Sequence, residues 1–251
     1  MEIVLCRDVL DAASRCADIV EELLQEKPDA VLGLPTGTTP LPFYEELRSR
    51  SLSFARVRSF NLDEYIGLPE GHPGSYTAYM ARNFDVNACS VCLPDGRAED
   101  LEKAASAYEA LIQEAGGIDL QILGIGRNGH IGFNEPGSSL KSRTRVKTLS
   151  EPTLKANASD FEGIEPPTMA LTMGIGTILE ARRIVLLAAG ASKAIAVRDM
   201  AEGPLSANCP ASALQMHEKP VVFVDPEAAS QLANTEYYQR SQALQEKLKN
   251  A

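Results

Sequence analysis

Positive charge is scarce in this chain of 251 residues. Lys and Arg number 24 against 34 Asp and Glu, so the formal net charge is −10 at pH 7. A nucleic-acid-binding protein needs clustered Lys and Arg to neutralise phosphates, and this balance argues against that class of partner. It leaves room for a small anionic ligand, because a local site can be positive on an acidic protein.

Long hydrophobic runs are also missing. No stretch approaches the roughly 20 apolar residues that cross a bilayer, and the N-terminus has an acidic second residue and no apolar signal core. The five cysteines are scattered, and an odd number in a chain of this length indicates reduced thiols. Cys89 and Cys92 form a lone C-x-x-C without a second pair, which disfavours zinc. We predict a soluble, cytoplasmic protein with no membrane partner.

Repeats, low-complexity tracts and linkers are absent, so we predict a single domain over residues 1–251. Short apolar runs alternate with stretches of helical periodicity. The predicted strands span 2–5, 30–34, 57–62, 118–124, 184–189 and 221–224, and the predicted helices span 8–26, 40–48, 75–84, 99–114, 192–201 and 226 onward. This alternation predicts an α/β fold with a mostly parallel open sheet and helices on both faces, a three-layer, Rossmann-like arrangement.

The polar segment 150–168 contains Pro166-Pro167 and interrupts this alternation. We interpret it as a mobile cover, and "the cover" denotes these residues below. Ligands of an open parallel sheet bind beyond the carboxyl ends of its strands. The loops that follow the predicted strands are therefore the places to look for chemistry.

The first such loop reads Gly33-Leu34-Pro35-Thr36-Gly37-Thr38-Thr39-Pro40. A strand ends, and a helix begins at Pro40 with Thr39 as its expected cap. Backbone N–H groups then point into one concavity at the positive end of a helix, which favours an anion. An ordinary strand-to-helix turn is the alternative, but two glycines and three threonines favour a phosphate site.

The second loop contains adjacent carboxylates, Asp63 and Glu64, just beyond a predicted strand. A side chain at that place can reach a ligand and act as a base. One of two adjacent carboxylates is often only a solvated loop charge.

The third loop contains G-x-G-x-x-G at Gly124, Gly126 and Gly129, the spacing of a dinucleotide-binding fingerprint. That fingerprint requires a helix that begins within the glycines. Here no helical periodicity follows. We interpret the glycines as a tight bend that lets His130 and Glu135 face one cavity, because a histidine can exchange protons near neutrality.

The fourth loop ends at Lys193, in Gly190-Ala-Ser-Lys. A solvated lysine is the simple interpretation, and a point charge beside the phosphate loop is the functional one. Phosphate donors, a carboxylate base and a His–Glu pair need no metal or cofactor. They suit proton transfer on a phosphorylated sugar.

Four segments of the chain strongly resemble the glucosamine-6-phosphate deaminase family. They are Leu32-Gly-Leu-Pro-Thr-Gly, Asn61-Leu-Asp-Glu-Tyr, Gly126-Arg-Asn-Gly-His-Ile-Gly-Phe-Asn-Glu-Pro and Gly190-Ala-Ser-Lys. The resemblance runs nearly end to end, and the second and third segments together are highly specific. It implies a cofactor-independent enzyme that converts an aminosugar phosphate, glucosamine 6-phosphate, and water to fructose 6-phosphate and ammonia.

The resemblance also implies roles for single residues. Asp63 matches the base that moves the C2 proton and gives an enolamine. His130 matches the residue that opens the pyranose ring by taking the O1 proton, and Glu135 matches its orienting partner. Asn128 lies where many members have Asp and some have Asn; an amide cannot accept a proton, so a charge-relay role at this position is open. The phosphate-holding positions of the family match Thr36, Gly37, Thr38 and Lys193.

One departure from the family concerns the phosphate. Members usually have an Arg that clasps it after the Ala-Asn that matches Ala156-Asn157, and here Ser159 and Asp160 occupy that region. An Arg–phosphate clamp is a charge-assisted bidentate contact. Its loss predicts weaker phosphate binding, unless another basic residue of the cover such as Lys155 substitutes.

Two other functions fit the same scaffold. Phosphogluconolactonases, which are hydrolases, place a Gly-His after the same strand, but typically carry Asp-Glu-Arg where this chain has Asp63-Glu64-Tyr65. They also lack the Phe-Asn-Glu-Pro that follows His130. A non-catalytic sugar-phosphate sensor is the remaining alternative, motivated by Asn128 and the missing Arg.

The segment 136–147 is rich in Lys, Arg and Ser on an acidic chain. It resembles the segment by which hexameric, allosterically activated members hold an N-acetylated aminosugar phosphate, with Ser138, Arg145 and Lys147 at the matching positions. Alternation at Arg143, Arg145 and Lys147 predicts three cations on one face of an extended strand. The expectation is a homo-oligomer, a hexamer by resemblance, although a solvated loop is the simple alternative.

Overall fold

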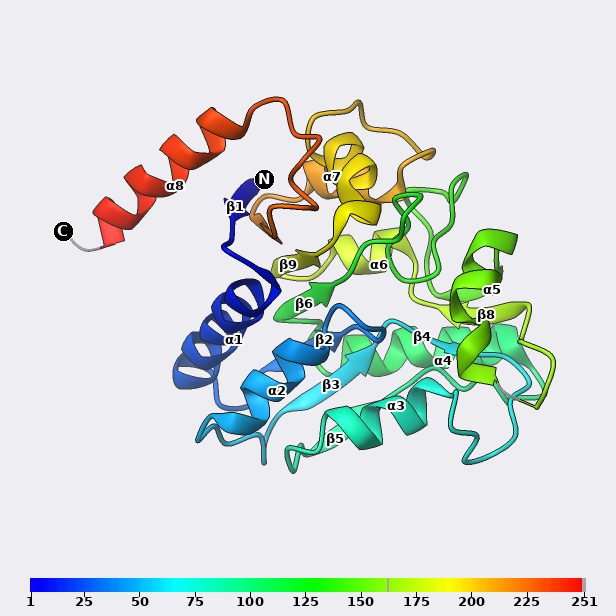
Figure 1. The fold of residues 1–251 in the computed structure, drawn as a ribbon. Helices are drawn as coiled ribbons and strands as arrows, with labels where there is room; N and C mark the ends of the chain where they lie inside the picture. The colour runs from blue at the N-terminus through cyan, green and yellow to red at the C-terminus, as the bar shows by residue number, and fades with distance from the viewer. Residues whose placement is uncertain (162, 250–251) are drawn as a thin grey trace.

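The computed structural model describes residues 1–161 and 163–249. Its centre is a sheet of seven parallel strands in the order β1-β10-β9-β6-β2-β3-β5 (Figure 1). These strands are β1 (Glu2–Leu5), β2 (Val31–Leu34), β3 (Arg58–Asn61), β5 (Ser90–Cys92), β6 (Leu120–Leu123), β9 (Arg183–Ala188) and β10 (Pro220–Val224). The predicted parallel open sheet is confirmed.

The strand order reverses between β2 and β6. From β2 the chain moves outward through β3 to β5, and from β6 it moves the other way through β9 to β10. Such a reversal opens a crevice at the carboxyl ends of the two strands, where ligands of open α/β sheets bind. The loops after β2 and β6 are the predicted phosphate loop and the histidine loop.

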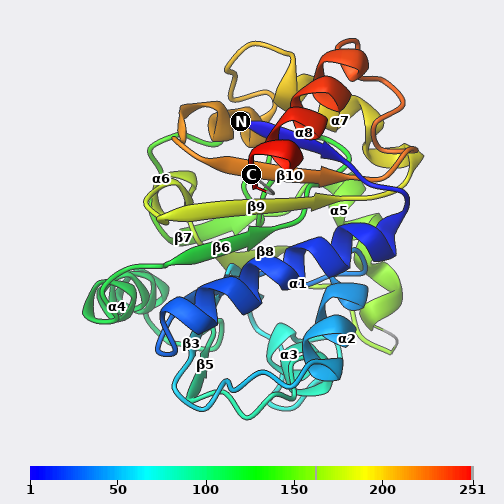
Figure 2. The ribbon, with the colours of Figure 1, turned by 90° about the vertical axis from the view of Figure 1, so that its left-hand side faces the viewer.

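Helices cover both faces of the sheet (Figure 2). Their buried side chains form two clusters, one on each face. One face packs against α1 (Val9–Glu26), α2 (Leu41–Ser49) and α3 (Tyr76–Asn83), and the other against α4 (Leu101–Glu114), α6 (Ile175–Leu179), α7 (Ala194–Ala201) and η3 (Pro210–Met216). Because both faces are covered, β2 and β6 consist of buried residues throughout, which explains why they are mostly apolar; the exception is Gln121 of β6, whose amide donates to the Ile122 carbonyl.

Side-chain caps begin three of these helices. Asp8, Ser75 and Asp100 accept hydrogen bonds from the first turns of α1, α3 and α4. The expected cap at Thr39 is wrong. Pro40 is the N-cap of α2, and no side chain caps that helix, because the Thr38 carbonyl already accepts the Leu41 N–H.

A second, antiparallel sheet was not predicted. It has the order β4-β8-β7, formed by β4 (Asp63–Tyr65), β8 (Met169–Thr172) and β7 (Arg145–Thr148). Asp63 pairs with Thr172 in this sheet. The predicted extended strand is correct for Arg145 and Lys147, whereas Arg143 lies outside β7.

The cover contains two short helices, α5 (Glu151–Asn157) and η1 (Ala158–Phe161), where the sequence predicts only a polar segment. Glu162 of the cover and residues 250 and 251 of the predicted helical tail lie outside the described residues. The tail helix α8 (Thr235–Lys249) starts later than predicted and lies beside β1, where the Gln242 side chain accepts the Leu5 N–H. Among the described helices, none combines the length and apolarity that a membrane crossing requires.

Candidate active site

Four loops meet at one cavity of about 800 Å³. They follow β9, β6, β2 and β3, which are consecutive in the sheet and parallel, so their carboxyl ends share one edge. We call these loops the floor: residues 35–40, 62–63, 124–134 and 189–193. The predicted site residues that line the cavity are Thr36, Gly37, Thr38, Asp63, Asn128, His130 and Lys193.

The phosphate loop is held from behind by two tyrosines. Tyr44 donates to the Pro35 carbonyl at 2.5 Å, and Tyr79 donates to the Gly37 carbonyl at 2.6 Å. In the described part of the chain, the Gly37 and Thr38 N–H groups donate to no protein acceptor. The carbonyls thus turn to the tyrosines and leave amide donors for an anion at the cavity.

Asp63 is buried, with only 4% of its surface exposed. Burial, and then the charge of Glu64, raise the pKa of Asp63 to about 8, although the Thr172 hydroxyl and the Phe133 N–H offset part of the effect. A carboxyl group with this pKa exchanges a proton near neutral pH, as a catalytic acid or base must.

Glu64, the neighbour of Asp63, has a structural role at the start of α3. Its carboxylate accepts hydrogen bonds from the N–H groups of Tyr76 and Thr77 and from the Thr77 hydroxyl. These residues form the first turn of α3, so Glu64 supplies the negative charge that a helix N-terminus favours. The two adjacent carboxylates are thereby distinguished, since only Asp63 lines the cavity.

Two glycines of the floor leave room for the reactive side chains. A Cβ atom on Gly126 would lie 2.3 Å from ring atoms of His130, so the imidazole occupies the space of the missing side chain. Gly132 has φ +54°, and a Cβ there would lie 3.3 Å from Asp63 Oδ2. No helix starts within these glycines, which confirms that the match to the dinucleotide fingerprint is accidental.

His130, Asn128 and Glu135 form a connected group. The Asn128 amide donates to Glu135 Oε2 at 2.7 Å, and its oxygen accepts the His130 N–H at 3.2 Å. His130 Nδ1 lies 3.7 Å from Glu135 Oε2, which is longer than a hydrogen bond, and it has no hydrogen-bond partner among the described residues. Asn128 therefore positions the carboxylate that faces the ring.

Glu135 lies behind the cavity and joins the floor to the cover. Its Oε1 accepts the hydroxyl groups of Thr153 at 2.5 Å and Ser150 at 3.1 Å, both at the start of α5. Burial alone would raise the pKa of Glu135, but the His130 ring, Thr153 and Asn128 together lower it to about 2. Glu135 is thus a fixed anion that faces His130 and anchors α5.

The far end of the cover docks on an aromatic cluster. Phe161 is buried and packs edge-on against Tyr65, with ring centroids 4.9 Å apart, and stacks near His72. Asn157 donates to the Tyr65 hydroxyl at 2.8 Å. The cover is therefore attached at both ends, and its residues 152, 153, 156, 157, 159 and 160 line the cavity.

Lys193 ends the 3-10 helix η2 (Ala191–Lys193) after β9. Burial, and then the charge of Arg127, lower the pKa of Lys193. Its loop is held by two carboxylates from the segment after β10, because Asp225 accepts the Gly190 N–H and Glu227 accepts the Ala191 N–H. These bonds fix the backbone and leave the ammonium group of Lys193 facing the cavity.

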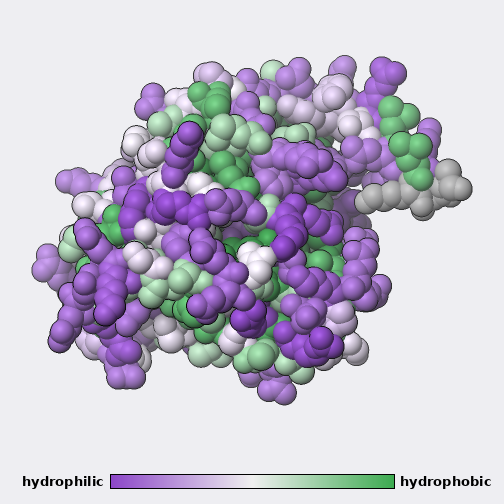
Figure 3. Space-filling model, turned by 180° about the vertical axis from the view of Figure 1, so that it is seen from behind, coloured by the Kyte–Doolittle hydropathy of each residue, from purple (hydrophilic) through white to green (hydrophobic). Residues whose placement is uncertain are grey.

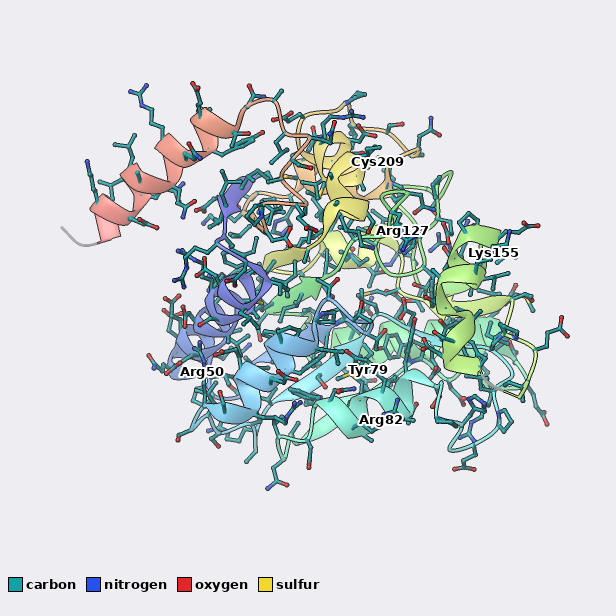
Figure 4. All side chains as sticks on the ribbon, viewed as in Figure 1. Arg50, Tyr79, Arg82, Arg127, Lys155 and Cys209 are labelled. Carbon is teal, nitrogen blue, oxygen red and sulfur yellow. The ribbon has the colours of Figure 1, made fainter. Side chains whose placement is uncertain are left out.

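Other predicted residues lie elsewhere. Lys155 projects from the outer side of α5, pairs with Glu151 at 3.8 Å and is not part of the cavity lining, so it is not placed to replace the missing Arg (Figure 4). Arg143 binds Glu109 and Glu180 of its own chain, which neutralise it. The prediction that it joins Arg145 and Lys147 on one cationic face is wrong.

Ser138, Arg145 and Lys147 are outside the cavity. The Ser138 hydroxyl is buried and has no hydrogen-bond partner among the described residues. Arg145 donates to Asn134 Oδ1 at 2.9 Å, and burial lowers its pKa. Arg145 thereby contacts the histidine loop through Asn134.

Several cavity or supporting residues were not found by the sequence reasoning. They are Arg82, Arg127, Ser192, Thr153 and Asp225. Arg127 had a readable signal, because a basic residue lies inside the glycine-rich loop next to Asn128. Thr153 and Asp225 act through contacts to residues distant in the chain, which sequence spacing does not reveal. Among the described residues, no group of three His, Cys, Asp or Glu is arranged to hold a metal.

The class of protein follows from a family comparison. Residues 8–223 match the family described as glucosamine-6-phosphate isomerases/6-phosphogluconolactonase, and the chain belongs to it. Within that family, proteins named glucosamine-6-phosphate deaminase are similar along nearly the whole chain. The one from Shewanella loihica is 51% identical over 97% of this chain and 94% of its own, and the one from Pseudarthrobacter chlorophenolicus is 50% identical over 96% of each.

Solved structures agree. A monomeric glucosamine-6-phosphate deaminase superposes with a TM-score of 0.88 at 48% identity, covering 92% of this chain and 100% of that one. The 6-phosphogluconolactonase of Trypanosoma brucei has a TM-score of 0.73 at 21% identity, covering 92% and 98%. The second likeness concerns the fold alone.

Proposed function

We propose that this chain is a glucosamine-6-phosphate deaminase. It converts glucosamine 6-phosphate and water to fructose 6-phosphate and ammonia. The observation that carries the proposal is one cavity that contains a buried carboxyl group with a pKa of about 8, a histidine facing a fixed carboxylate, and an anion-binding loop. Relatives of that name at about 50% identity support the same function.

The first chemical step in this proposal is ring opening. His130 takes the proton from O1 of the pyranose as the ring C1–O5 bond breaks, and the imidazolium so formed then gives a proton to O5, which leaves as a hydroxyl group. The charge that develops on the imidazole is stabilised by Glu135, which remains ionised because its pKa is about 2. The gap of 3.7 Å between Nδ1 and Oε2 would shorten once the ring is charged.

The second step belongs to Asp63. Its carboxylate removes the C2 proton and gives an enolamine, and the same carboxyl group returns a proton to C1. Water then adds at C2, and ammonia leaves as the ketone forms. One group that both takes and gives a proton needs a pKa near the working pH, and burial provides this for Asp63.

Tyr65 bears on the hydrolase alternative. It occupies the place of the Arg that typifies phosphogluconolactonases, and it is buried between Phe133 and Phe161. Its hydroxyl accepts hydrogen bonds from the Tyr76 hydroxyl and from the amide of Asn157, a residue of the cover. A side chain used in this way holds the cover and supplies no cation to a lactone, which favours the deaminase.

An assay with two substrates tests the proposal. Purified protein is expected to release ammonia from glucosamine 6-phosphate and not to hydrolyse 6-phosphogluconolactone. Lactone hydrolysis without ammonia release would establish the hydrolase. Tight binding of the sugar phosphate without either reaction would establish a sensor.

We also propose that the protein is cytoplasmic and forms a homo-oligomer. The more specific proposal is a hexamer that is activated by N-acetylglucosamine 6-phosphate. The unpartnered Ser138 hydroxyl and the half-buried Arg145 support an anion site there. Two observations weigh against the hexamer: a solved relative is described as monomeric, and the face seen from behind is mostly hydrophilic (Figure 3). Light scattering distinguishes a 27.0 kDa monomer from an assembly.

A further inference from the structure

Two cations lie together on the floor of the cavity. Arg127 follows β6, and Lys193 follows the neighbouring strand β9. Both line the cavity that contains Thr36, Gly37 and Thr38. In Figure 4, Arg127 lies between α7 and α5.

Neither of these cations has a countercharge among the described residues. In residues 1–161 and 163–249, no carboxylate oxygen lies within 4.0 Å of the guanidinium of Arg127 or the ammonium of Lys193. Arginines elsewhere in the fold are neutralised, as Arg50 is by Asp18, Glu21 and Glu46. Two neighbouring like charges repel each other, and the repulsion is relieved when an anion binds between them.

Arg82 offers a contrast within the same cavity. Its guanidinium donates to the Pro73 carbonyl at 3.0 Å, so part of its hydrogen-bonding capacity is used to hold the α3 region. Arg127 makes no side-chain hydrogen bond in the described part of the chain. Its planar fork of donors is free, and such a fork matches two oxygens of a phosphate.

We propose that Arg127 is a phosphate-binding residue that, with Lys193 and the amides of the 36–38 loop, completes the phosphate site of this chain. The inference rests on the proposed function, which supplies the phosphorylated substrate. It resolves the departure noted at Ser159 and Asp160: the guanidinium that the cover lacks is provided by the floor. Phosphate binding then uses no charged group of the cover.

Arg127 also lies within the turn that carries His130. The Gly126 N–H donates to the His130 carbonyl at 2.8 Å, and the His130 N–H donates to Asn128, so Arg127 is enclosed between bonded residues. A phosphate held by Arg127 therefore restrains the same backbone turn that places the imidazole. Arg127 contacts the phosphate and positions His130 only indirectly.

The test compares Arg127→Ala, Arg127→Lys and the matched control Arg82→Ala. Arg127→Ala is expected to raise the KM for glucosamine 6-phosphate by about 10- to 100-fold, as the loss of a charge-assisted bidentate contact implies. Arg127→Lys should recover part of this loss, because it keeps the charge and not the fork. Arg82→Ala removes one positive charge from the same cavity, and it should raise KM by a smaller factor than Arg127→Ala, because part of the hydrogen-bonding capacity of Arg82 is used on the Pro73 carbonyl.

A binding measurement makes the result independent of turnover. Calorimetric titration with inorganic phosphate is expected to show weaker binding to Arg127→Ala than to the wild type, even if the deaminase assay itself were negative. Unchanged phosphate binding and a KM within twofold of the wild type would overturn the role of Arg127. A KM that rises as much in Arg82→Ala as in Arg127→Ala would also overturn it, because any cation would then serve. Thermal melting of each variant verifies folding.

Discussion

The floor and the cover enclose the same cavity but contribute different things to it. The floor carries Asp63, His130 and Lys193 on loops fixed by the parallel strands and by backbone hydrogen bonds. The cover contributes short helices held by the Thr153–Glu135 hydrogen bond and by the Phe161–Tyr65 contact. In the proposed mechanism, the groups that transfer protons or bind anions are on the floor, and the cover supplies enclosure.

This difference teaches where each property of the site comes from. A carboxyl group reaches a pKa of about 8 only where water is kept away, and Asp63 is buried in part by the second sheet beneath the cover. Closure matters because it strengthens electrostatic interactions inside the site. Substitutions on the floor are expected to abolish individual chemical steps, whereas substitutions in the cover are expected to change the rates of these steps by smaller factors.

The largest effect is expected for Asp63→Asn. The amide keeps the shape of the side chain and loses the base, so turnover should fall by about 1000-fold or more, within the range for general acid–base catalysis. Binding of the sugar phosphate should remain near normal in calorimetry. Glu64→Gln is the matched control: it should lower the melting temperature, because Glu64 caps α3, and retain most of the turnover. Near-normal turnover by Asp63→Asn would refute the assignment of the base.

His130→Gln tests the second floor residue. Turnover should fall about 100-fold on the closed pyranose, since the ring-opening base is lost. The loss should be smaller on substrate supplied in its open-chain form. Stopped-flow assays with freshly opened and equilibrated substrate can compare the two. Equal losses on both forms would contradict ring opening as the role of His130.

The pH profile should follow Asp63. With a pKa of about 8, the ionised fraction, and with it kcat/KM, should rise by about tenfold between pH 7 and pH 9. Folding has the opposite dependence. Because the folded pKa is raised from 3.8, the contribution of Asp63 to stability is greatest below that value and is lost as pH rises through about 8.

Chemical denaturation measures this second dependence without substrate. Asn at position 63 imitates the protonated acid, so the stability of the wild type relative to Asp63→Asn should decline between pH 4 and pH 8. A constant difference across this range would show that the carboxyl group titrates near its ordinary pKa.

The link between floor and cover can be broken by Thr153→Val. This change removes the hydroxyl that donates to Glu135 and preserves the volume of the side chain. Turnover is expected to fall by about three- to tenfold, since a single hydrogen bond is worth about 1 kcal/mol. Lys155→Ala, on the outer face of the same helix, is the control and should leave the rate unchanged. A rise in KM with unchanged turnover would show that this hydrogen bond serves substrate binding and does not orient His130.

The smallest effect is expected from Ser159→Arg, which gives the cover the guanidinium of its family. KM should fall about two- to fivefold, because the floor already binds the phosphate and the added contact lies near Asp160. In the Arg127→Ala background, the same substitution should lower KM by a larger factor. Equal effects in both backgrounds would mean that cover and floor bind the phosphate independently.

Elements buried on both faces could be read from the sequence. Mostly apolar runs mark β2, β6 and β9, and the loops after them contain most of the predicted site residues. The second sheet could not be read, because β4 is three residues long and pairs with β8 far along the chain. The helix α5 was missed because its residues are mostly polar, although Pro152 near its start is a helix signal.

Side-chain contacts across the chain explain the remaining omissions. Glu64 looks like Asp63 in the sequence, and only the packing of α3 separates the cap from the buried acid. Thr153 and Asp225 act on residues in other loops. Arg127 is adjacent to the predicted Asn128, but only the folded surroundings reveal that no carboxylate of the described residues pairs with it.

The space above Gly126 has a consequence for which residue this position can hold. Every side chain larger than hydrogen would displace the imidazole, since even a Cβ would lie 2.3 Å from its ring atoms. A side chain at position 126 would therefore move the imidazole of His130, whichever residues occupy position 128 and the cover. In the glycine spacing that imitates a nucleotide-binding signature, the glycine at position 126 thus makes room for the ring of a histidine.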